Sequence, residues 1–248
     1  MANGKEPKSL EKGLLETVAN SDIQDVAKDG AEIVIDSLLD AGVLRDIPIV
    51  NTVLGLAKAG VSVKDRLFAE KVLRFLNPLS KYSSEERRQY LNDLDQDELK
   101  KASQYMVLYI DRLDSLDKPA MLGKVFEAYM LGRIGFKAML YFSHFIDSIF
   151  ILTWQDYYQA IKHWHDNRAG TPQIAIDDAL ALEKVGFYVE HTKPDEYFEP
   201  QLRVGMLKGI KRKLVLTDAG WQFIQVVFQL WLGKDEDRKR SWLSVELD

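Results

Sequence analysis

We expect this chain to be mainly α-helical, with a helical N-terminal body and a small mixed α+β module near the C-terminal end. Over most of the first 165 residues, apolar residues recur at the three- and four-residue spacing of amphipathic helices. Two short runs of β-branched and aromatic residues occur only after that point. At 248 residues, the chain is long enough for one large domain or two smaller ones.

The first segment, residues 1–80, is predicted to consist of packed helices. A helical apolar pattern runs from Ile49 to Leu76, and the Asn77-Pro78 pair ends it. Inside it, residues 47–63 are predicted to form one buried core helix. Its uncharged part is much shorter than the roughly 20 apolar residues that a membrane span needs, so membrane binding is not expected.

The central segment, residues 81–165, is predicted to be helical and packed on the first. Ser84, with glutamates directly after it, is typical of a helix start. Asp117-Lys118-Pro119 is typical of a break followed by a new helix with proline in its first turn. The dense apolar residues of 136–150 are expected to form a core helix.

A separate module is predicted at residues 166–233, followed by a charged tail at 234–248. Turn-forming residues between Asp166 and Pro172 separate this module from the helices before it. The expected order is a helix at 172–185, a strand at 187–192, a polar loop at 193–211, a strand at 212–217, and a helix capped by Thr217 and Asp218.

This module resembles the C-terminal half of a winged helix-turn-helix domain. Leu182-Glu-Lys-Val-Gly186 resembles the end of a recognition helix, and Phe187–Glu190 and Lys213–Leu216 resemble the two wing strands. Thr217-Asp-Ala-Gly220 resembles the start of the following helix. The resemblance covers about the last third of the chain and implies binding of a macromolecule.

The charges of the module favour a protein partner over specific DNA. A DNA-reading helix presents donors and cations to the major groove, whereas the corresponding helix here is acidic, and the whole chain has a net charge of −5. Basic residues are found instead toward the second strand, where they suit weak, non-specific contact with phosphates. The residues expected to bind a partner are Asp177, Asp178, Glu183, Lys208, Lys211, Arg212 and Lys213.

No pattern predicts a catalytic residue, a metal site or a cofactor. The chain has no cysteine, which removes thiolate ligands and cysteine nucleophiles. Gly55 and Gly60 have the spacing of a phosphate loop but lack the Lys-Ser/Thr pair that follows it. His163 and His165 are two apart, which separates them on a helix. Three acids, Asp111, Asp114 and Asp117, are expected on neighbouring faces of one helix as a solvated surface.

The central residues from Tyr109 to Asp147 also resemble uncharacterised bacterial proteins found among mobile elements and defence genes. That resemblance implies a setting in bacterial stress or phage-related biology. Together with the polar N-terminus, it leads us to expect a cytoplasmic, non-enzymatic interaction or regulatory protein that binds another protein or a second copy of itself. Three alternatives remain open: a membrane-active, pore-forming effector that uses residues 47–63, a DNA-binding regulator, and a hydrolase whose site is assembled only in three dimensions.

Overall fold

The computed structural model describes residues 9–21, 23, 47–55, 62–167, 175–190, 210–230 and 243–247, and it is mainly helical. The chain divides into two compact units, residues 1–147 and 148–248. This division falls before the boundary expected after residue 165, because helix α10 packs with the elements that follow it. We describe each unit separately.

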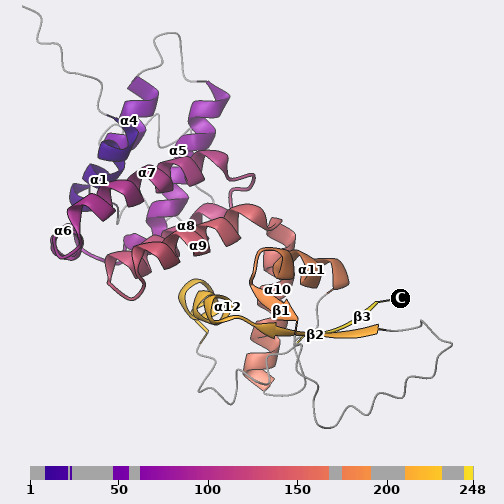
Figure 1. Cartoon of the computed structure of the whole chain (residues 1–248). Coiled ribbons are helices and arrows are strands. Elements are labelled where there is room, and N and C mark those ends of the chain that lie inside the picture. Colours follow the sequence, from indigo (N-terminus) through magenta and orange to yellow (C-terminus); the bar gives the residue numbers. More distant parts are fainter. Residues whose placement is uncertain are drawn as a thin grey trace, which may run out of the picture. The chain divides into compact units, whose positions relative to one another are not determined.

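The N-terminal unit contains only helices among its described residues (Figure 1). They are α1 (Leu10–Asn20), α4 (Pro48–Gly55), α5 (Val63–Leu76), the 3-10 turn η2 (Asn77–Leu79), α6 (Ser84–Asn92), α7 (Gln96–Arg112), α8 (Lys118–Met130) and α9 (Phe136–Ser148). Helix α1 packs against α4, α6 and α7, and α5 packs against α7 and α8. Residues 81–165 are therefore helical as predicted, apart from short turns.

Side-chain caps fix where several of these helices begin. Ser83 accepts a hydrogen bond from the backbone N–H of Glu86, and the Glu86 carboxylate accepts one in return from Ser83 N–H. This reciprocal cap satisfies donors that the first helical turn leaves free. Ser62 and Asp65 form the same arrangement at the start of α5. The predicted break at Asp117 is confirmed, since α8 begins at Lys118 with Pro119 in its first turn.

The prediction of a single helix over residues 47–63 is wrong. Helix α4 is described over Pro48–Gly55, residues 56–61 lie outside the described residues, and Ser62 has an extended backbone that caps the next helix, α5. Ile49 and Val50 are fully buried, whereas Val63 is 83% exposed. The cap at Ser62 favours the start of a new helix over the continuation of an earlier one. The apolar spacing continues across Ser62, and for this reason it predicted one helix where the structure has α4 and α5.

A close helix contact lies at the centre of the N-terminal unit. A Cβ atom added at Gly123 of α8 would lie 2.2 Å from the backbone oxygen of Phe75 in α5. Only glycine permits this approach. Beside it, the rings of Phe75 and Phe126 pack with centroids 5.6 Å apart, and both side chains are fully buried.

The C-terminal unit combines helices with a three-stranded antiparallel sheet in the order β1-β2-β3. Its elements are α10 (Ile151–Asn167), α11 (Ile176–Lys184), β1 (Tyr188–Glu190), β2 (Ile210–Leu216), α12 (Asp218–Phe223), the π-helical turn η3 (Ile224–Phe228) and β3 (Leu243–Leu247). Tyr188 pairs with Leu216, and Ile210 pairs with Leu247. Part of the expected charged tail is therefore a strand, because residues 243–247 complete the ladder of β2, while residues 234–242 and 248 lie outside the described residues.

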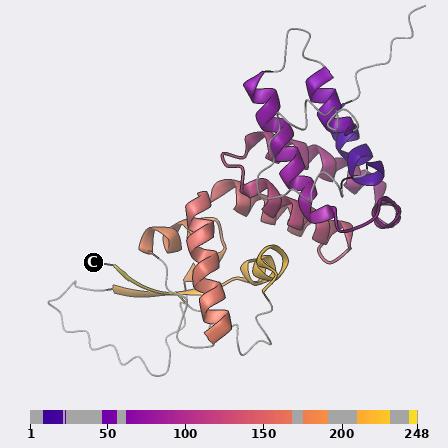
Figure 2. The same cartoon turned by 180° about the vertical axis from the view of Figure 1, so that it is seen from behind.

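An aromatic cluster joins α10 to the sheet and to α12. Trp154 of α10 stacks on Phe223 with centroids 4.8 Å apart and meets Phe187 edge-on at 5.4 Å. All three side chains are buried. Both views show α10 alongside the strands (Figures 1 and 2). Thr217 caps α12 by accepting from the N–H of Gly220, which confirms the predicted cap.

Within the described residues, no single helix is long and apolar enough to cross a membrane. The consecutive helices α9 and α10 reach the required length and hydropathy only when the two are taken together.

Candidate functional site

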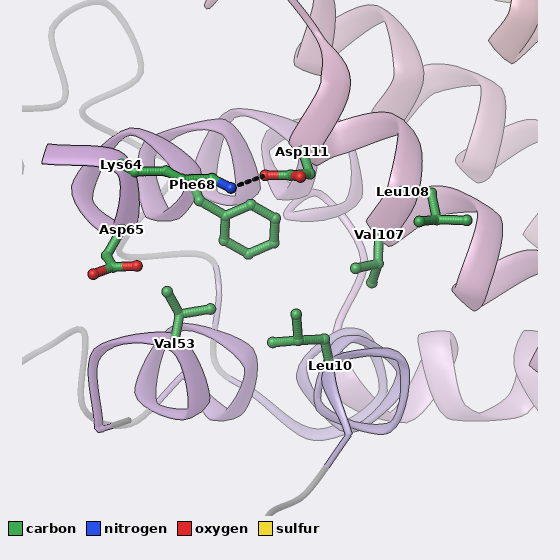
Figure 3. A pocket seen from close by; sticks show the side chains of 8 residues that line it. All are labelled: Leu10, Val53, Lys64, Asp65, Phe68, Val107, Leu108 and Asp111. Atoms are coloured by element: carbon green, nitrogen blue, oxygen red, sulfur yellow. Dashed lines mark ion pairs between the residues drawn. The ribbon is translucent and has the colours of Figure 1, made fainter. Parts of the chain in front are cut away.

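A pocket of about 300 Å³ opens in the N-terminal unit among four helices (Figure 3). Five of the described side chains around it are apolar, and three are charged. They are Leu10 of α1, Val53 of α4, Lys64, Asp65 and Phe68 of α5, and Val107, Leu108 and Asp111 of α7. This volume lies at the low end of the roughly 300–1,000 Å³ range of ligand pockets, so it suits one or two apolar side chains better than a large cofactor.

The fold brings these residues together through the packing of α1 on α4 and α7 and of α5 on α4 and α7. The reciprocal cap between Ser62 and Asp65 sets the first turn of α5. Lys64 and Phe68, four residues apart, therefore share one face of that helix. Phe68 is buried and lies centrally among the side chains in Figure 3, with Val53 and Leu10 on one side and Val107 on another.

The charged residues lie at one edge of the pocket. Lys64 Nζ lies 4.0 Å from Asp111 Oδ1, and these side chains are 81% and 49% exposed. The carboxylate of Asp65 accepts hydrogen bonds from the Ser62 hydroxyl at 2.6 Å and from the Ser62 N–H at 3.1 Å, and these bonds lower the pKa of Asp65. The three groups carry two negative charges and one positive charge at neutral pH.

A buried lysine holds the end of α7 against α5 beside the pocket. Lys71 Nζ donates to the backbone oxygen of Asp111 at 3.0 Å. Burial lowers the pKa of Lys71, while the nearby Asp111 and Asp114 act in the opposite direction. The Asp111 main chain is therefore tethered, and its carboxylate lies on the pocket side (Figure 3).

Exposed apolar side chains are also found on α5 and α7, two of the helices that line the pocket. Leu108, which lines it, is 58% exposed, and Leu67 and Val63 of α5 are also exposed. Single exposed apolar residues are ordinary on protein surfaces. The sequence contained a signal for this exposure: Met106, Val107 and Leu108 are consecutive, whereas one buried helix face needs only the first.

The acidic residues predicted to bind a partner lie on α11 of the C-terminal unit. Asp177 is exposed. Asp178 accepts a hydrogen bond from the Thr153 hydroxyl at 2.5 Å, which ties α11 to α10. Glu183 is half-buried and also takes part in an interaction. The structure thus gives Asp178 a structural contact, and a role for these acids in partner binding stays a prediction.

The predicted basic residues are only partly described. Lys211, Arg212 and Lys213 lie consecutively on β2, opposite Glu246, Val245 and Ser244 of β3 in the strand register. Lys208 lies outside the described residues.

The three acids expected on one helix do not share one. Helix α7 ends at Arg112, so Asp111 is on the helix while Asp114 and Asp117 follow it. Asp114 Oδ1 lies 2.7 Å from Nζ of Lys118, the first residue of α8. Arg112 instead contacts the carboxylate of Asp147 at 2.5 Å.

Helix α10 carries the two histidines that were considered as metal ligands. The ring of His165 lies 3.0 Å from the carboxylate of Asp166, and Lys162 also binds Asp166, at 2.8 Å. Across the part of the chain that the structure describes, no three His, Cys, Asp or Glu residues are arranged to hold a metal ion.

The chain was compared with protein families, curated proteins and solved structures. No family model matches it, and none of the curated proteins or solved structures shows significant similarity to it. The geometry of the molecule is therefore what supports a function.

Proposed function

We propose that this protein is a non-enzymatic interaction protein, and that the pocket of its N-terminal unit receives an apolar side chain of a protein partner. The observation that carries the proposal is the convergence of Leu10, Val53, Phe68, Val107 and Leu108 from four helices on one open pocket. Binding energy at protein interfaces is concentrated where an apolar anchor fills such a pocket inside a polar rim.

The pocket is better suited to an anchor than to a reaction. Its central part is aliphatic and aromatic. The carboxylate of Asp65 is engaged in a helix cap, and Lys64 lies mostly in solvent. Neither group is positioned over the apolar part as an acid, base or nucleophile would need to be. The arrangement therefore supports binding.

A displayed library of random 12-residue peptides tests this proposal on the full chain. We expect selection to yield peptides with a leucine, isoleucine, methionine or phenylalanine anchor. Their binding should be lost in Leu108→Asp, which places a charge at the pocket edge without disturbing a buried position. Leu152→Asp is the matched control, because Leu152 is 53% exposed and does not line the pocket. Equal binding by both variants, or no selected anchor, would overturn the proposal.

We also propose a winged-helix-like arrangement for the C-terminal unit as a second contact surface. The order α11, β1, β2 and α12 supports it, because it matches the helix, wing strands and following helix of that class. Acids on α11 favour a protein partner at this surface as well. The same partner would then bind both surfaces, and its apolar anchor would fill the N-terminal pocket.

A DNA-binding function is a second candidate, supported by the three consecutive cations of β2. Together with Lys208, they would neutralise at most about four phosphates, so the log–log salt slope for duplex DNA should be no steeper than roughly −3.6. Replacing all four by alanine should abolish that salt dependence, and Asp177→Ala should leave binding unchanged or strengthen it. A tight consensus from random-site selection that Asp177→Ala destroys would favour a sequence reader over a protein-contact surface.

A further inference from the structure

The charges at the edge of the pocket define the chemistry of the segment that enters it. We propose that the partner places a lysine or arginine on Asp111 when its apolar side chain fills the pocket. This inference rests on the proposed function and adds a second recognition element to it: an apolar anchor with an adjacent cation.

The present partner of Asp111 is weakly held. Lys64 Nζ lies 4.0 Å from the carboxylate, at the outer limit of an ion pair, and the Lys64 side chain is 81% exposed. Exposed pairs of this kind contribute little to stability, because water screens them and a long side chain must be ordered. Lys64 can therefore move away at little cost when another cation arrives.

Asp111 itself is held in place. Its backbone oxygen accepts the hydrogen bond of the buried Lys71, which links the end of α7 to α5. Its carboxylate is half-exposed and lines the pocket. A main chain that is fixed before binding loses less freedom when a ligand arrives, which favours recognition at this carboxylate.

The balance of charge favours a cation over an anion. Among the charged residues that line the pocket, Asp65 and Asp111 are acids and Lys64 is the one cation, while the buried Lys71 behind them is bound to the Asp111 backbone oxygen. The Asp65 carboxylate is already occupied by Ser62, so Asp111 is the better acceptor. An incoming carboxylate would meet the like charge of Asp111 and would have the solvent-exposed Lys64 as its partner on the lining. An arginine, whose planar donors match a carboxylate, fits this edge best.

The test uses the peptides selected on the full chain. We expect most to carry arginine or lysine within four residues of the anchor. Replacing that cation by glutamine should weaken binding about threefold to fivefold, the size of a half-exposed ion pair. Asp111→Asn should cause the same loss with the original peptide and no further loss with the glutamine peptide. Lys64→Ala should leave binding unchanged or strengthen it, and the effect of Asp111→Asn should fade at about 1 M salt.

Asp97→Asn is the matched control, because Asp97 is an exposed acid in the first turn of the same helix and does not line the pocket. The selected peptides would overturn this inference if they carried no cation and bound Asp111→Asn as tightly as the wild type. If their binding still required Leu108, the proposed function would stand. Acidic peptides that lose affinity in Lys64→Ala would overturn this inference as well. A dimer that Leu108→Asp separates would show that a second copy fills the pocket, and would also overturn it. Absence of any peptide that depends on Leu108 would remove both proposals.

Discussion

The two units of this protein hold their helices together by different chemistry. In the N-terminal unit, charged side chains tie helix ends to backbone carbonyls: the buried Arg87 of α6 donates to Val18 O at 2.6 Å, to Ser21 O at 2.5 Å and to Tyr82 O. In the C-terminal unit, an aromatic cluster around Trp154 performs the same task.

A buried carboxylate extends the polar pattern of the N-terminal unit. Glu127 of α8 is 3% exposed and accepts a hydrogen bond from Tyr82 and an ion pair from Lys81, each at 2.8 Å. Burial together with this carboxylate raises the pKa of Tyr82 to about 12, because a phenolate here would be desolvated and would lie beside a second negative charge. Buried polar groups are costly unless paired, and their directional bonds fix how these helices meet.

The N-terminal unit adds buried, directed polar contacts to an apolar core that includes Phe75 and Phe126, whereas ring packing predominates around α10 in the C-terminal unit. Directed contacts hold a particular geometry, which the pocket beside α7 requires. Aromatic burial contributes more per residue and tolerates changes in shape, because it is roughly proportional to area. Four substitutions test this difference, and they follow in decreasing order of their expected effect on the free energy of unfolding.

Trp154→Ala should have the largest effect. Truncating a buried tryptophan costs about 3–5 kcal/mol through lost burial and the cavity left behind. The indole Nε1 is buried without a hydrogen-bond partner among the described residues, so the loss is one of packing. Trp154→Phe should therefore cost clearly less. Hydrogen exchange measured by mass spectrometry should show lost protection mainly in residues 151–230. An equal loss in residues 62–147 would contradict a role of Trp154 confined to the C-terminal unit.

Arg87→Met should destabilise the N-terminal unit by on the order of 3 kcal/mol. Hydrogen bonds to a charged group contribute about 1.5–3 kcal/mol each, and the freed carbonyls regain part of this from water. Arg87→Lys should recover only part of the loss, because a single ammonium cannot span three carbonyls as the guanidinium fork does. Chemical denaturation measures both. A full rescue by lysine would show that charge, and not direction, is what matters at this position.

Gly123→Ala tests how closely the N-terminal unit is packed. The new Cβ would lie 2.2 Å from Phe75 O, so backbone must shift, and overpacking of this kind costs about 1–3 kcal/mol. Gly135→Ala is the control, because nothing lies within 4 Å of its Cβ position. Gly135 O accepts from Met139 N–H at the start of α9, so this change should cost about 1 kcal/mol or less, through the loss of a glycine cap. Thermal unfolding of both variants measures this difference, and equal melting temperatures would contradict the close approach of α5 and α8.

Ser83→Ala should have the smallest effect, about 0.5–2 kcal/mol, because it removes one helix cap. The hydrogen bonds from Ser83 lower the pKa of Glu86. A lowered folded-state pKa means that this stabilisation is present above the ordinary glutamate pKa, near 4.3, and is lost as the pH falls through the folded-state value. The difference between wild type and Ser83→Ala should therefore shrink between pH 7 and pH 3. A constant difference would show that the carboxylate adds nothing to the cap.

Helix starts were predictable wherever a short-range signal exists. The cap at Thr217 and the break at Asp117 depend on residues within a few positions of each other, and both are found. The helix start predicted at Ser84 is confirmed, with Ser83 as the residue that caps it. The joining of residues 47–63 into one helix was wrong because apolar spacing continues across Ser62, whose extended backbone ends the pattern.

The helical class, the start of α6, the cap at Thr217 and the approximate positions of β1 and β2 could be predicted from the sequence, because these follow from interactions between residues near one another in the chain. The strand β3 could not be predicted, because it forms by pairing with β2. Only the tertiary structure decided the pocket, because its lining extends from Leu10 to Asp111 and depends on how four helices pack. The same holds for Arg87, whose carbonyl partners on α1 lie 66 and 69 residues away. No local pattern marks such contacts, since the free energy that forms them comes from burying surfaces that meet only after the helices have packed.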